Sequence, residues 1–285
     1  MQGFLNIYKD SGESSAKVVA HIKKLFRNKK VGHMGTLDPM ACGVLPIAVG
    51  KATRMFDYFL DKVKSYRAIF TFGYETDTLD ALGEIINTHE RIPTLDEVKN
   101  STDKFVGEID QLPPQFSAKN VNGVRAYQLA RMGKNVVLST KKVQIIDFKC
   151  LSQISENSFE FEITCGSGTY IRSLCRDLAY ELGTFATMTF LERTNSGVFN
   201  IDSSIKAKEL NNDNIEKYLI KIEDVFPKFS KVYVDNITAT RLINGQTVFI
   251  NSDATEKVFV FNDNKLIGLG LVSNKKIKLD VHLNE

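Results

Sequence analysis

An aspartate that precedes a proline, Asp38, lies in the most informative segment of the sequence, which reads GHMGTLDPMACGVLPIAVGKATR from Gly32 to Arg54. A residue before proline is disfavoured in the helical region of backbone space, so Asp38 should lie on a bent, projecting loop. In that position it can offer a carboxylate to a ligand. The alternative is that Asp38 caps a short helix that begins at Pro39. Considered alone, the dipeptide favours the capping role.

Other residue types that could carry chemistry are scattered. The four cysteines form no C-x-x-C pair and only four histidines accompany them, so we expect neither a zinc site nor a disulfide framework. Cys42 lies near Asp38, but no histidine has the spacing of a base partner, and we interpret Cys42 as a small packing residue. We find no P-loop and no dinucleotide fingerprint. The sequence predicts no metal and no cofactor.

Composition bounds the class of protein. A chain of 285 residues can bury a sizeable core and suggests one large domain, or a large domain with a small appendage. Its 43% apolar and 25% charged residues are typical of a globular protein. The N-terminus has no apolar segment of signal length, and no apolar run has the length of a membrane span. We therefore expect a cytoplasmic protein that does not contact membranes.

The net charge of +3 does not by itself predict a nucleic-acid partner. The distribution of charge is more informative, because no acidic residue lies between Glu13 and Asp38. The basic residues of this interval could form a track for phosphates, or simply the solvated face of a helix. They are Lys17, Lys23, Lys24, Arg27, Lys29 and Lys30.

Helices and strands that would position these residues are mixed along the chain. A serine start and apolar residues at helical spacing predict an amphipathic helix at Ser14–Phe26. Alternating patterns predict strands at Ser65–Gly73, Val143–Lys149 and Ser158–Thr164. Further helices are expected at Thr94–Val106, Val124–Met132 and Tyr170–Leu182. The absence of a regular βαβ rhythm favours an α+β fold with a central, mainly antiparallel sheet flanked by helices.

The pattern changes after FPKFS at Phe226–Ser230, where a proline follows the last helical stretch. Short strands are then expected at Lys231–Val234, Thr247–Ile250, Lys257–Phe261, Leu266–Val272 and Ile277–Val281. We therefore divide the chain into a main domain, residues 1–228, and a small β-rich C-terminal domain, residues 229–285. In the main domain, the polar segment TDTLDALGEIINTHERIP is expected to form a functional loop or a small hairpin.

Taken as a whole, the segment around Asp38 closely resembles the catalytic motif of bacterial tRNA pseudouridine-55 synthases, the TruB family. The matching residues are His33, Gly35, Thr36, Leu37, Asp38, Pro39, Gly43, Leu45, Pro46, Gly50, Thr53 and Arg54. The resemblance implies a pseudouridine synthase fold in which Asp38 is the catalytic residue. It would add to C1′ of the sugar or C6 of the base, or assist an elimination. The C-terminal domain resembles a PUA-like RNA-binding appendage, with a structural cap as the alternative.

Two further catalytic roles follow from the resemblance. Arg172 lies in a Gly-Thr-Tyr-Ile-Arg segment similar to the family motif whose arginine pairs with the aspartate. A fixed cation there would favour the ionised carboxylate and orient it. Tyr66 lies in a strand similar to the one whose tyrosine stacks on the flipped target base. Tyr66 could also assist proton removal from C5, although a phenol is a poor base at neutral pH; without the resemblance it would be a core aromatic.

Substrate-binding roles are implied for four more residues. Tyr170 and Leu191 would line the pocket, with an ordinary buried leucine as the alternative for the second. His33 would insert into the RNA loop near the displaced base, or be a partly buried histidine with satisfied hydrogen bonds. Asp80, in TDTLDA, would lie near the cleft and hold Arg172 or a neighbour in place, or belong to an Asp-rich turn.

Basic residues expected at the RNA backbone are Lys9, Lys119, Arg125 and Arg131. The last three lie in QLPPQFSAKNVNGVRAYQLARMG, a segment that resembles the border of the RNA cleft in the family. The chain departs from the family pattern at two places. It has Lys9–Asp10 where the family usually has Lys-Pro, and Ser-Ala-Lys-Asn at residues 117–120 where the family has Ser-Ala-x-Lys.

Together these features predict an enzyme that isomerises uridine to pseudouridine at position 55 in the T arm of tRNA. We expect a monomer that needs no obligate protein partner. One alternative is a guide-RNA-dependent synthase, but those enzymes carry longer terminal extensions and a fuller C-terminal RNA-binding domain. Another is a noncatalytic RNA chaperone that opens the tRNA elbow. Substituting Asp38 by Asn would separate binding from catalysis.

Overall fold

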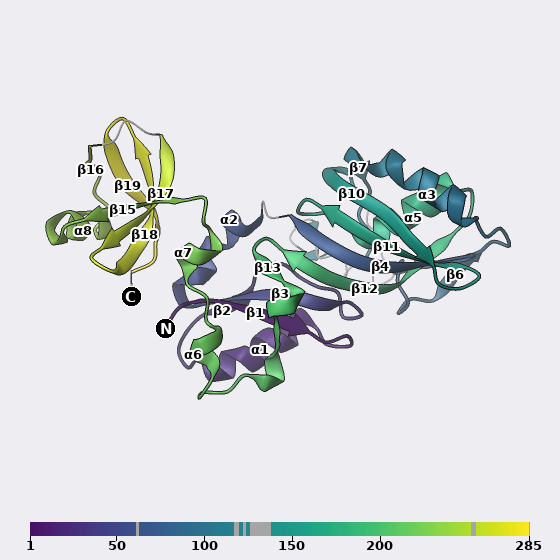
Figure 1. Ribbon diagram of the computed structural model, residues 1–285, viewed down its shortest axis with the longest axis horizontal. Coiled ribbons are helices and arrows are strands. Elements are labelled where there is room, and N and C mark those ends of the chain that lie inside the picture. The colour runs from purple at the N-terminus through teal and green to yellow at the C-terminus, as the bar shows by residue number, and fades with distance from the viewer. Residues whose placement is uncertain (61–62, 117–119, 122–123, 126–137, 252–254, 285) are drawn as a thin grey trace.

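The computed structural model describes residues 1–285 except 61–62, 117–119, 122–123, 126–137, 252–254 and 285, and it contains a large central sheet and a smaller C-terminal sheet (Figure 1). The order of the large sheet is β14-β1-β3-β12-β4-β11-β10-β7; in addition, β2 pairs with β3 and β13 pairs with β12. Its strands are β1 (Gly3–Lys9), β2 (Val31–His33), β3 (Cys42–Val49), β4 (Lys64–Phe72), β7 (Gly107–Gln111), β10 (Lys141–Gln153), β11 (Ser158–Cys165), β12 (Ala186–Ser196), β13 (Phe199–Asn200) and β14 (Ile205–Lys206).

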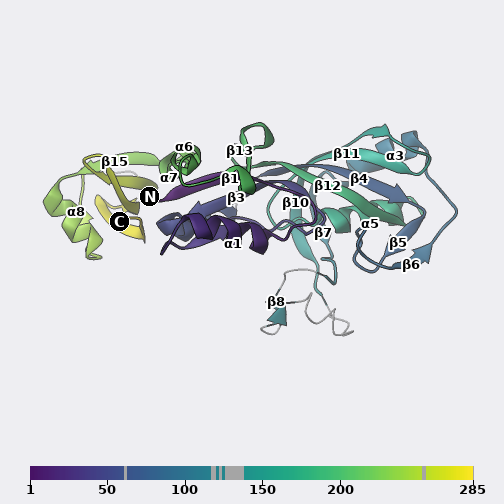
Figure 2. The ribbon, with the colours of Figure 1, turned by 90° about the horizontal axis from the view of Figure 1, so that it is seen from below.

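Most neighbouring strands of this sheet are antiparallel, whereas β1 with β14 and β3 with β12 are parallel. Helices flank it: α1 lies beside the half that contains β1 and β3, and α3 and α5 lie beside the half that contains β10 and β11 (Figures 1 and 2). The helices of the main domain are α1 (Ser15–Leu25), α2 (Phe56–Leu60), α3 (Leu95–Thr102), α5 (Ile171–Glu181), α6 (Ile215–Tyr218) and α7 (Ile222–Val225). The predicted α+β fold with a mainly antiparallel sheet is confirmed.

Local signals explain several of these elements. The Ser14 side chain accepts a hydrogen bond from the Lys17 N–H and caps α1, which buries Val18 and Ile22 on one face. Strand β4 buries every second residue from Tyr66 to Phe72, as its alternating sequence predicts. The polar segment after β4 forms the hairpin of β5 (Tyr74–Thr76) and β6 (Ile85–Thr88). The described part of the main domain also contains the short 3-10 helices η1 (Gly50–Met55), η2 (Asp103–Phe105), η3 (Ile201–Ser203) and η4 (Ala207–Glu209).

Some predicted elements differ from the observed ones. Where a helix was expected at Val124–Met132, residues Val124–Arg125 form strand β9, paired with β8 (Asn120–Val121), and residues 126–132 lie outside the described residues. The helix expected at Thr94–Val106 is shorter, because α3 ends at Thr102 and η2 follows. The capping box between Thr94 and Glu97 fixes its start.

The C-terminal sheet has the order β15-β17-β18-β19-β16. Its strands are β15 (Ser230–Val234), β16 (Val248–Phe249), β17 (Glu256–Asn262), β18 (Lys265–Ser273) and β19 (Lys276–His282), in agreement with the predicted strands. A helix that the sequence reasoning missed, α8 (Asn236–Ile243), lies beside it (Figure 1). Asp235 caps this helix by accepting from the Thr238 N–H, at 2.8 Å.

An apolar cluster spans the junction of the two sheets, and we call it the junction cluster. The main domain contributes Phe4, Phe59, Phe199 and Phe226, and the C-terminal domain contributes Phe259, Leu269 and Leu283. Ring contacts run continuously across the junction, from Phe4 to Phe226 (centroids 5.9 Å apart), to Phe229 (6.0 Å) and to Phe259 (5.5 Å). The division at residue 228 therefore separates two sheets but cuts through one core, and the domain boundary itself remains a prediction.

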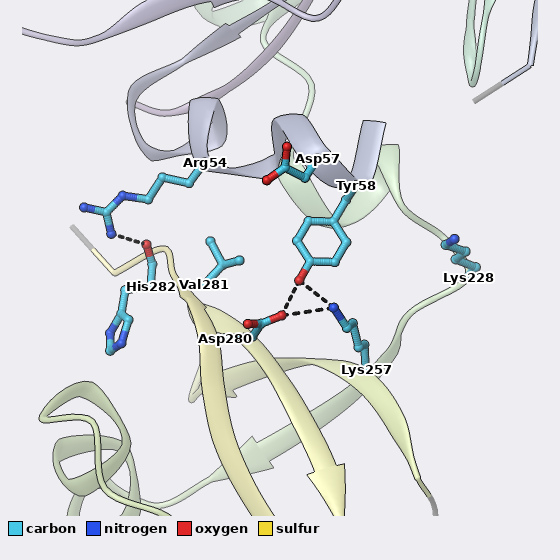
Figure 3. A pocket seen from close by; sticks show the side chains of 8 residues that line it. All are labelled: Arg54, Asp57, Tyr58, Lys228, Lys257, Asp280, Val281 and His282. Atoms are coloured by element: carbon cyan, nitrogen blue, oxygen red, sulfur yellow. Dashed lines mark hydrogen bonds and ion pairs between the residues drawn. The ribbon is translucent and has the colours of Figure 1, made fainter. Parts of the chain in front are cut away.

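Polar contacts surround a cavity of about 580 Å³ beside this cluster (Figure 3). Asp280 accepts hydrogen bonds from the Tyr58 hydroxyl and, at 3.0 Å, from the Lys257 ammonium. Lys257 also lies over the Tyr58 ring, 4.4 Å from its centroid. Arg54 donates to the His282 carbonyl at 2.9 Å. These contacts fix the C-terminal sheet against η1 and α2. Among the described helices, none has the length and apolarity needed to span a membrane.

Gly43 allows the close parallel pairing of β3 with β12. Its φ is +99°, and a Cβ there would lie 2.3 Å from the Arg193 carbonyl oxygen. We therefore expect Gly43→Ala to lower the free energy of unfolding by at least about 3 kcal/mol. Gly12→Ala is the matched control, because Gly12 has a similar φ of +84° but nothing within 4 Å of its Cβ position, and should cost about 1 to 2 kcal/mol. Equal losses in urea denaturation would contradict this account.

Candidate active site

A pocket of about 290 Å³ opens where β4, β12, the loop after β2 and the start of α5 meet. Segments far apart in the sequence therefore contribute to one site, through the pairing of β12 with both β3 and β4. The lining residues are Gly35, Thr36, Leu37, Asp38, Phe56, Lys64, Tyr66, Ser167, Gly168, Thr169, Tyr170, Ile171, Arg172, Leu191 and Arg193.

Asp38 lies on a loop, and its carboxylate does not cap a helix, because the residues that follow it form a turn. The Ala41 N–H donates to the Asp38 carbonyl at 3.1 Å and closes this turn. The Ser15 hydroxyl of α1 donates to the Leu37 carbonyl at 2.9 Å and accepts from the Leu37 N–H at 3.0 Å. Helix α1 thus anchors the residue before Asp38. The expectation of a bent loop is met, and the helix-capping alternative is wrong.

Lys9 supports this loop from inside the protein, which corrects its expected position at the RNA backbone. Its side chain is fully buried at the end of β1. The ammonium donates to the carbonyls of Glu13 at 2.6 Å, Asp10 at 3.0 Å and Pro39 at 3.3 Å. A phosphate in solution cannot reach it, so Lys9 joins the loop after β1 to the Asp38 loop. Burial lowers its pKa, and the nearby carboxylates of Glu13 and Asp38 oppose this shift.

Arg172, in the first turn of α5, lies between two carboxylates. One of its terminal nitrogens is 2.9 Å from Asp38 Oδ2, and the other is 3.4 Å from Asp80 Oδ2. The guanidinium also donates to the Thr78 carbonyl at 2.9 Å and the Phe116 carbonyl at 3.1 Å. With only 5% of its side chain exposed, Arg172 is fixed by partners on every side. The structure therefore brings Asp38, Arg172 and Asp80 together.

Asp80 is held in a tight turn of the β5–β6 hairpin. Its carboxylate accepts from the Thr78 hydroxyl at 2.8 Å and from the Leu82 N–H at 3.0 Å. The turn includes Leu79 at φ +61°, a conformation that is unfavourable for a side chain of this size. The surrounding hydrogen bonds keep Leu79 in this conformation, and one of them is donated by the Thr76 hydroxyl to the Asp80 carbonyl. This geometry aims the Asp80 carboxylate at Arg172.

The electrostatics of Asp38 reflect these neighbours. Burial raises the pKa of the Asp38 carboxyl above its usual range, the Arg172 guanidinium opposes the shift, and the Asp80 carboxylate adds to it. Ionisation of Asp38 in the pocket therefore depends on the charge of Arg172. About a third of the Asp38 side chain is exposed, at 34%, so the carboxylate is accessible to a molecule that enters the pocket.

Tyr66 lies on β4 at the wall of the pocket and is 7% exposed. Burial raises the pKa of Tyr66 to about 12, and the Arg193 guanidinium, to which it is hydrogen-bonded, opposes the shift. The phenol therefore stays protonated at neutral pH, which argues against Tyr66 as the base that removes a proton. Its ring remains available as part of the pocket surface.

Tyr170 and Leu191 also line the pocket, as expected. Gln111, at the end of β7, holds the backbone of Tyr170 with two hydrogen bonds, from the Tyr170 N–H at 2.8 Å and to the Tyr170 carbonyl at 3.1 Å. Leu191 is 5% exposed, and its carbonyl accepts a weak hydrogen bond from the Cys42 thiol, with sulfur and oxygen 3.7 Å apart. Burial raises the pKa of Cys42, in keeping with a packing residue.

The described part of the chain places His33 outside the set of residues that line this pocket, and it includes only one of the three remaining basic residues. His33 ends β2 and is half-buried, and burial, with the Arg193 charge, lowers its pKa. Its Nδ1 atom is buried without a hydrogen-bond partner in the described part of the chain. Lys119 and Arg131 lie outside the described residues, and Arg125 belongs to β9.

Comparisons with known proteins show the family of this chain. Residues 23–171 match the family model of the TruB family pseudouridylate synthase (N terminal domain), and residues 172–222 match the tRNA pseudouridylate synthase B C-terminal domain. The tRNA pseudouridine synthase B of Clostridium novyi (strain NT) is 40% identical over 98% of this chain and 99% of that protein. Its namesake in Clostridium perfringens (strain 13 / Type A) is 40% identical over the full length of both chains. The chain belongs to the TruB family of pseudouridine synthases.

Solved structures share the fold of this TruB family chain. One comes from an H/ACA RNP bound to a substrate RNA containing 2′-deoxyuridine, with a TM-score of 0.73, 22% identity and coverage of 99% of this chain and 85% of that chain. Another, from a Cbf5-Nop10-Gar1 complex, gives a TM-score of 0.68 and 26% identity, and covers 95% of this chain and 78% of that chain. The predicted pseudouridine synthase fold is thus confirmed.

Arg193 is a residue of the TruB family site that the sequence reasoning missed. Its side chain, on β12, is almost fully buried, with 1% exposed. It donates to the carbonyls of Val44 at 2.7 Å, Gly35 at 3.1 Å and Thr36 at 3.4 Å. Arg193 therefore fixes the loop before Asp38 at Gly35 and Thr36, and Ser15 fixes it at Leu37. In the sequence, the one signal for Arg193 was its position two residues after Leu191. Its hydrogen-bond partners could not be inferred without knowing that β3 pairs with β12.

Proposed function

We propose that this chain isomerises uridine to pseudouridine at position 55 in the T arm of tRNA, with Asp38 as the nucleophile. The observation that carries the proposal is the 2.9 Å pair between Asp38 and the buried Arg172 in a pocket of a TruB family chain. The reaction breaks the N1–C1′ bond, turns the base and joins C1′ to C5. The C5 hydrogen leaves as a proton and N1 gains one, so no oxidant or reductant is needed.

In this proposal each residue acts through its observed position. Arg172 keeps Asp38 ionised and oriented, and Asp80 fixes Arg172 from behind. The target uridine leaves its stack and lies against the Tyr66 ring, between Tyr170 and Leu191. Proton transfer from C5 then falls to water or another group, since the pKa of Tyr66 is raised to about 12.

RNA outside the pocket would be bound by further residues. His33 inserts beside the displaced base, and Arg125, together with Lys119 and Arg131, contacts the backbone. The PUA-like domain, residues 229–285, adds RNA contacts of its own. We also propose a cytoplasmic monomer that needs no obligate protein partner. Two full-length relatives named tRNA pseudouridine synthase B support the choice of tRNA over a guide-RNA complex.

The test is tritium release from a tRNA transcript labelled at C5 of uridine, with the modified position mapped afterwards. The purified chain alone should release tritium from position 55. A transcript with cytidine at that position should release none from the T loop. Release that requires an added guide RNA would support the guide-dependent alternative and overturn the proposal. A tRNA that binds without any release would support the chaperone.

A further inference from the structure

Lys64 is a charged group of the active-site pocket that the mechanism above does not use. It begins β4, two residues before Tyr66, so the two side chains project from the same face of the strand. Both line the pocket. Residues i and i+2 of a strand are about 6.6 Å apart along its axis, a span suited to a nucleotide whose base lies at one residue and whose backbone lies at the other. This spacing would place Lys64 beside the backbone of a nucleotide whose base lies against Tyr66.

The Lys64 ammonium has no carboxylate partner among the described residues. Its one hydrogen bond to them is donated to the Ser167 hydroxyl, at 2.8 Å, and this bond fixes its position without neutralising it. Its stem passes Gly35, because a Cβ at that glycine would lie 3.9 Å from Lys64 Cε. A partly buried cation that is held in position and has no carboxylate partner favours the binding of an anion.

A second lysine lies at the same turn. The Lys141 ammonium is 2.8 Å from the position that a Cβ of Gly168 would occupy, so it lies against the Gly166–Gly168 turn. This turn is tied to β10 by the Gly166 N–H, which donates to the Gln144 carbonyl at 2.8 Å. No ion pair of Lys141 occurs within the described part of the chain. Two positive charges thus lie at the turn that carries Ser167: Lys64, which lines the pocket and donates to the Ser167 hydroxyl, and Lys141, which lies against Gly168.

We infer that Lys64, Ser167 and Lys141 form a subsite for a phosphodiester of the RNA backbone next to the flipped uridine. The inference rests on the proposed function, since it assigns the target nucleotide's backbone to this turn. Lys64 makes the inner contact and Lys141 the outer one. The subsite would hold the nucleotide's backbone in place while the base turns. During that step the N1–C1′ bond between base and sugar is broken.

The electrostatics of Lys64 agree with this role. Burial lowers the pKa of Lys64 to about 8, and the Arg193 charge adds to the shift, while the Cys165 thiol opposes it. Lys64 is thus largely protonated at neutral pH but is held in a position that disfavours its charge. A phosphate would offset that cost, so binding of RNA and protonation of Lys64 should reinforce each other.

The experiment is a cycle that pairs a protein change with a change in the RNA. A T-arm stem-loop is made with a neutral methylphosphonate either 5′ or 3′ of the target uridine. Binding and initial rates are measured for the wild type, Lys64→Met and Lys64→Arg. Lys142→Met is the control, because Lys142 is exposed and pairs with Glu108 at 2.6 Å, away from the pocket.

We expect Lys64→Met to raise KM about tenfold, with a smaller change in kcat, and to reduce the salt dependence of binding by about one phosphate contact. One of the two methylphosphonates should raise the KM of the wild type by the same factor. It should raise the KM of Lys64→Met no further. Lys64→Arg should retain most of the affinity, and Lys142→Met should match the wild type.

The subsite would be overturned if the effects of Lys64→Met and of each methylphosphonate on KM were additive, or if Lys64→Met left KM unchanged. Failure of the proposed function would be seen separately, because the wild type would then release no tritium from the unmodified stem-loop. In that case the binding arm still decides whether Lys64 contacts a backbone phosphate.

Discussion

Asp38→Asn is expected to reduce pseudouridine formation by at least about 10³-fold while leaving tRNA affinity within a few-fold of the wild type. The amide keeps the size of the side chain and can still accept a hydrogen bond from Arg172. It cannot act as a carboxylate nucleophile. Single-turnover tritium release gives the rate, and filter binding of the same transcript gives the affinity.

The matched control is Asp177→Asn. Asp177 is also a partly buried carboxylate beside an arginine, Arg176, at 2.7 Å, but it does not line the pocket. Its substitution should change turnover less than about threefold. Turnover of Asp38→Asn within tenfold of the wild type would defeat the assignment of the nucleophile.

The second large effect is expected at Arg172. Arg172→Met would remove the cation that pairs with the Asp80 carboxylate and the donor of two backbone carbonyls, so it should lower the free energy of unfolding by about 3 kcal/mol. The rate should fall by at least about 10²-fold, since Asp38 loses the cation that orients it. Arg172→Lys keeps the charge but not the planar fork, and is the variant to use if Arg172→Met does not fold.

The pH profile of Arg172→Lys distinguishes an electrostatic role from a purely structural one. The Arg172 charge lowers the pKa of Asp38 against burial, so a weaker contact must let that pKa rise. Since only ionised Asp38 attacks, the acidic limb of kcat/KM should then move to higher pH. An acidic limb at the wild-type position would mean that Arg172 supports the loop without influencing the carboxylate.

Much of this site could be predicted because its signals are local. The Asp38 loop follows from a proline and its neighbouring glycines, and α1 and β4 follow from their periodicity. The pairing of Asp38 with Arg172 could be predicted only from a resemblance, because nothing in either segment indicates that α5 begins beside the loop after β2. The strand order of the sheet brings Asp38 and Arg172 together, and this order cannot be deduced from a single sequence.

Residues whose roles depend on distant partners could not be predicted. Lys9 was expected at the RNA backbone, yet its ammonium is buried and donates to backbone carbonyls from two loops. Lysine is rarely buried, so nothing in the sequence indicated this interior position. Arg193 acts through β3, which lies far from it in sequence. Helix α8 was missed because its β-branched Ile237 and Thr240 have low helix propensity. The helix is stabilised instead by packing of the buried Leu242.

The junction cluster makes the C-terminal domain a poor candidate for deletion. Phe4 and Phe226 are fully buried, and they reach Phe259 through continuous ring contacts. A chain cut at residue 228 would expose this aromatic surface to water, which favours aggregation over a stable shortened enzyme. We therefore expect the two sheets to unfold as one cooperative unit. Loss of tRNA binding after such a cut would report a damaged core, and the domain's own contribution is better separated by substitutions on its outer surface.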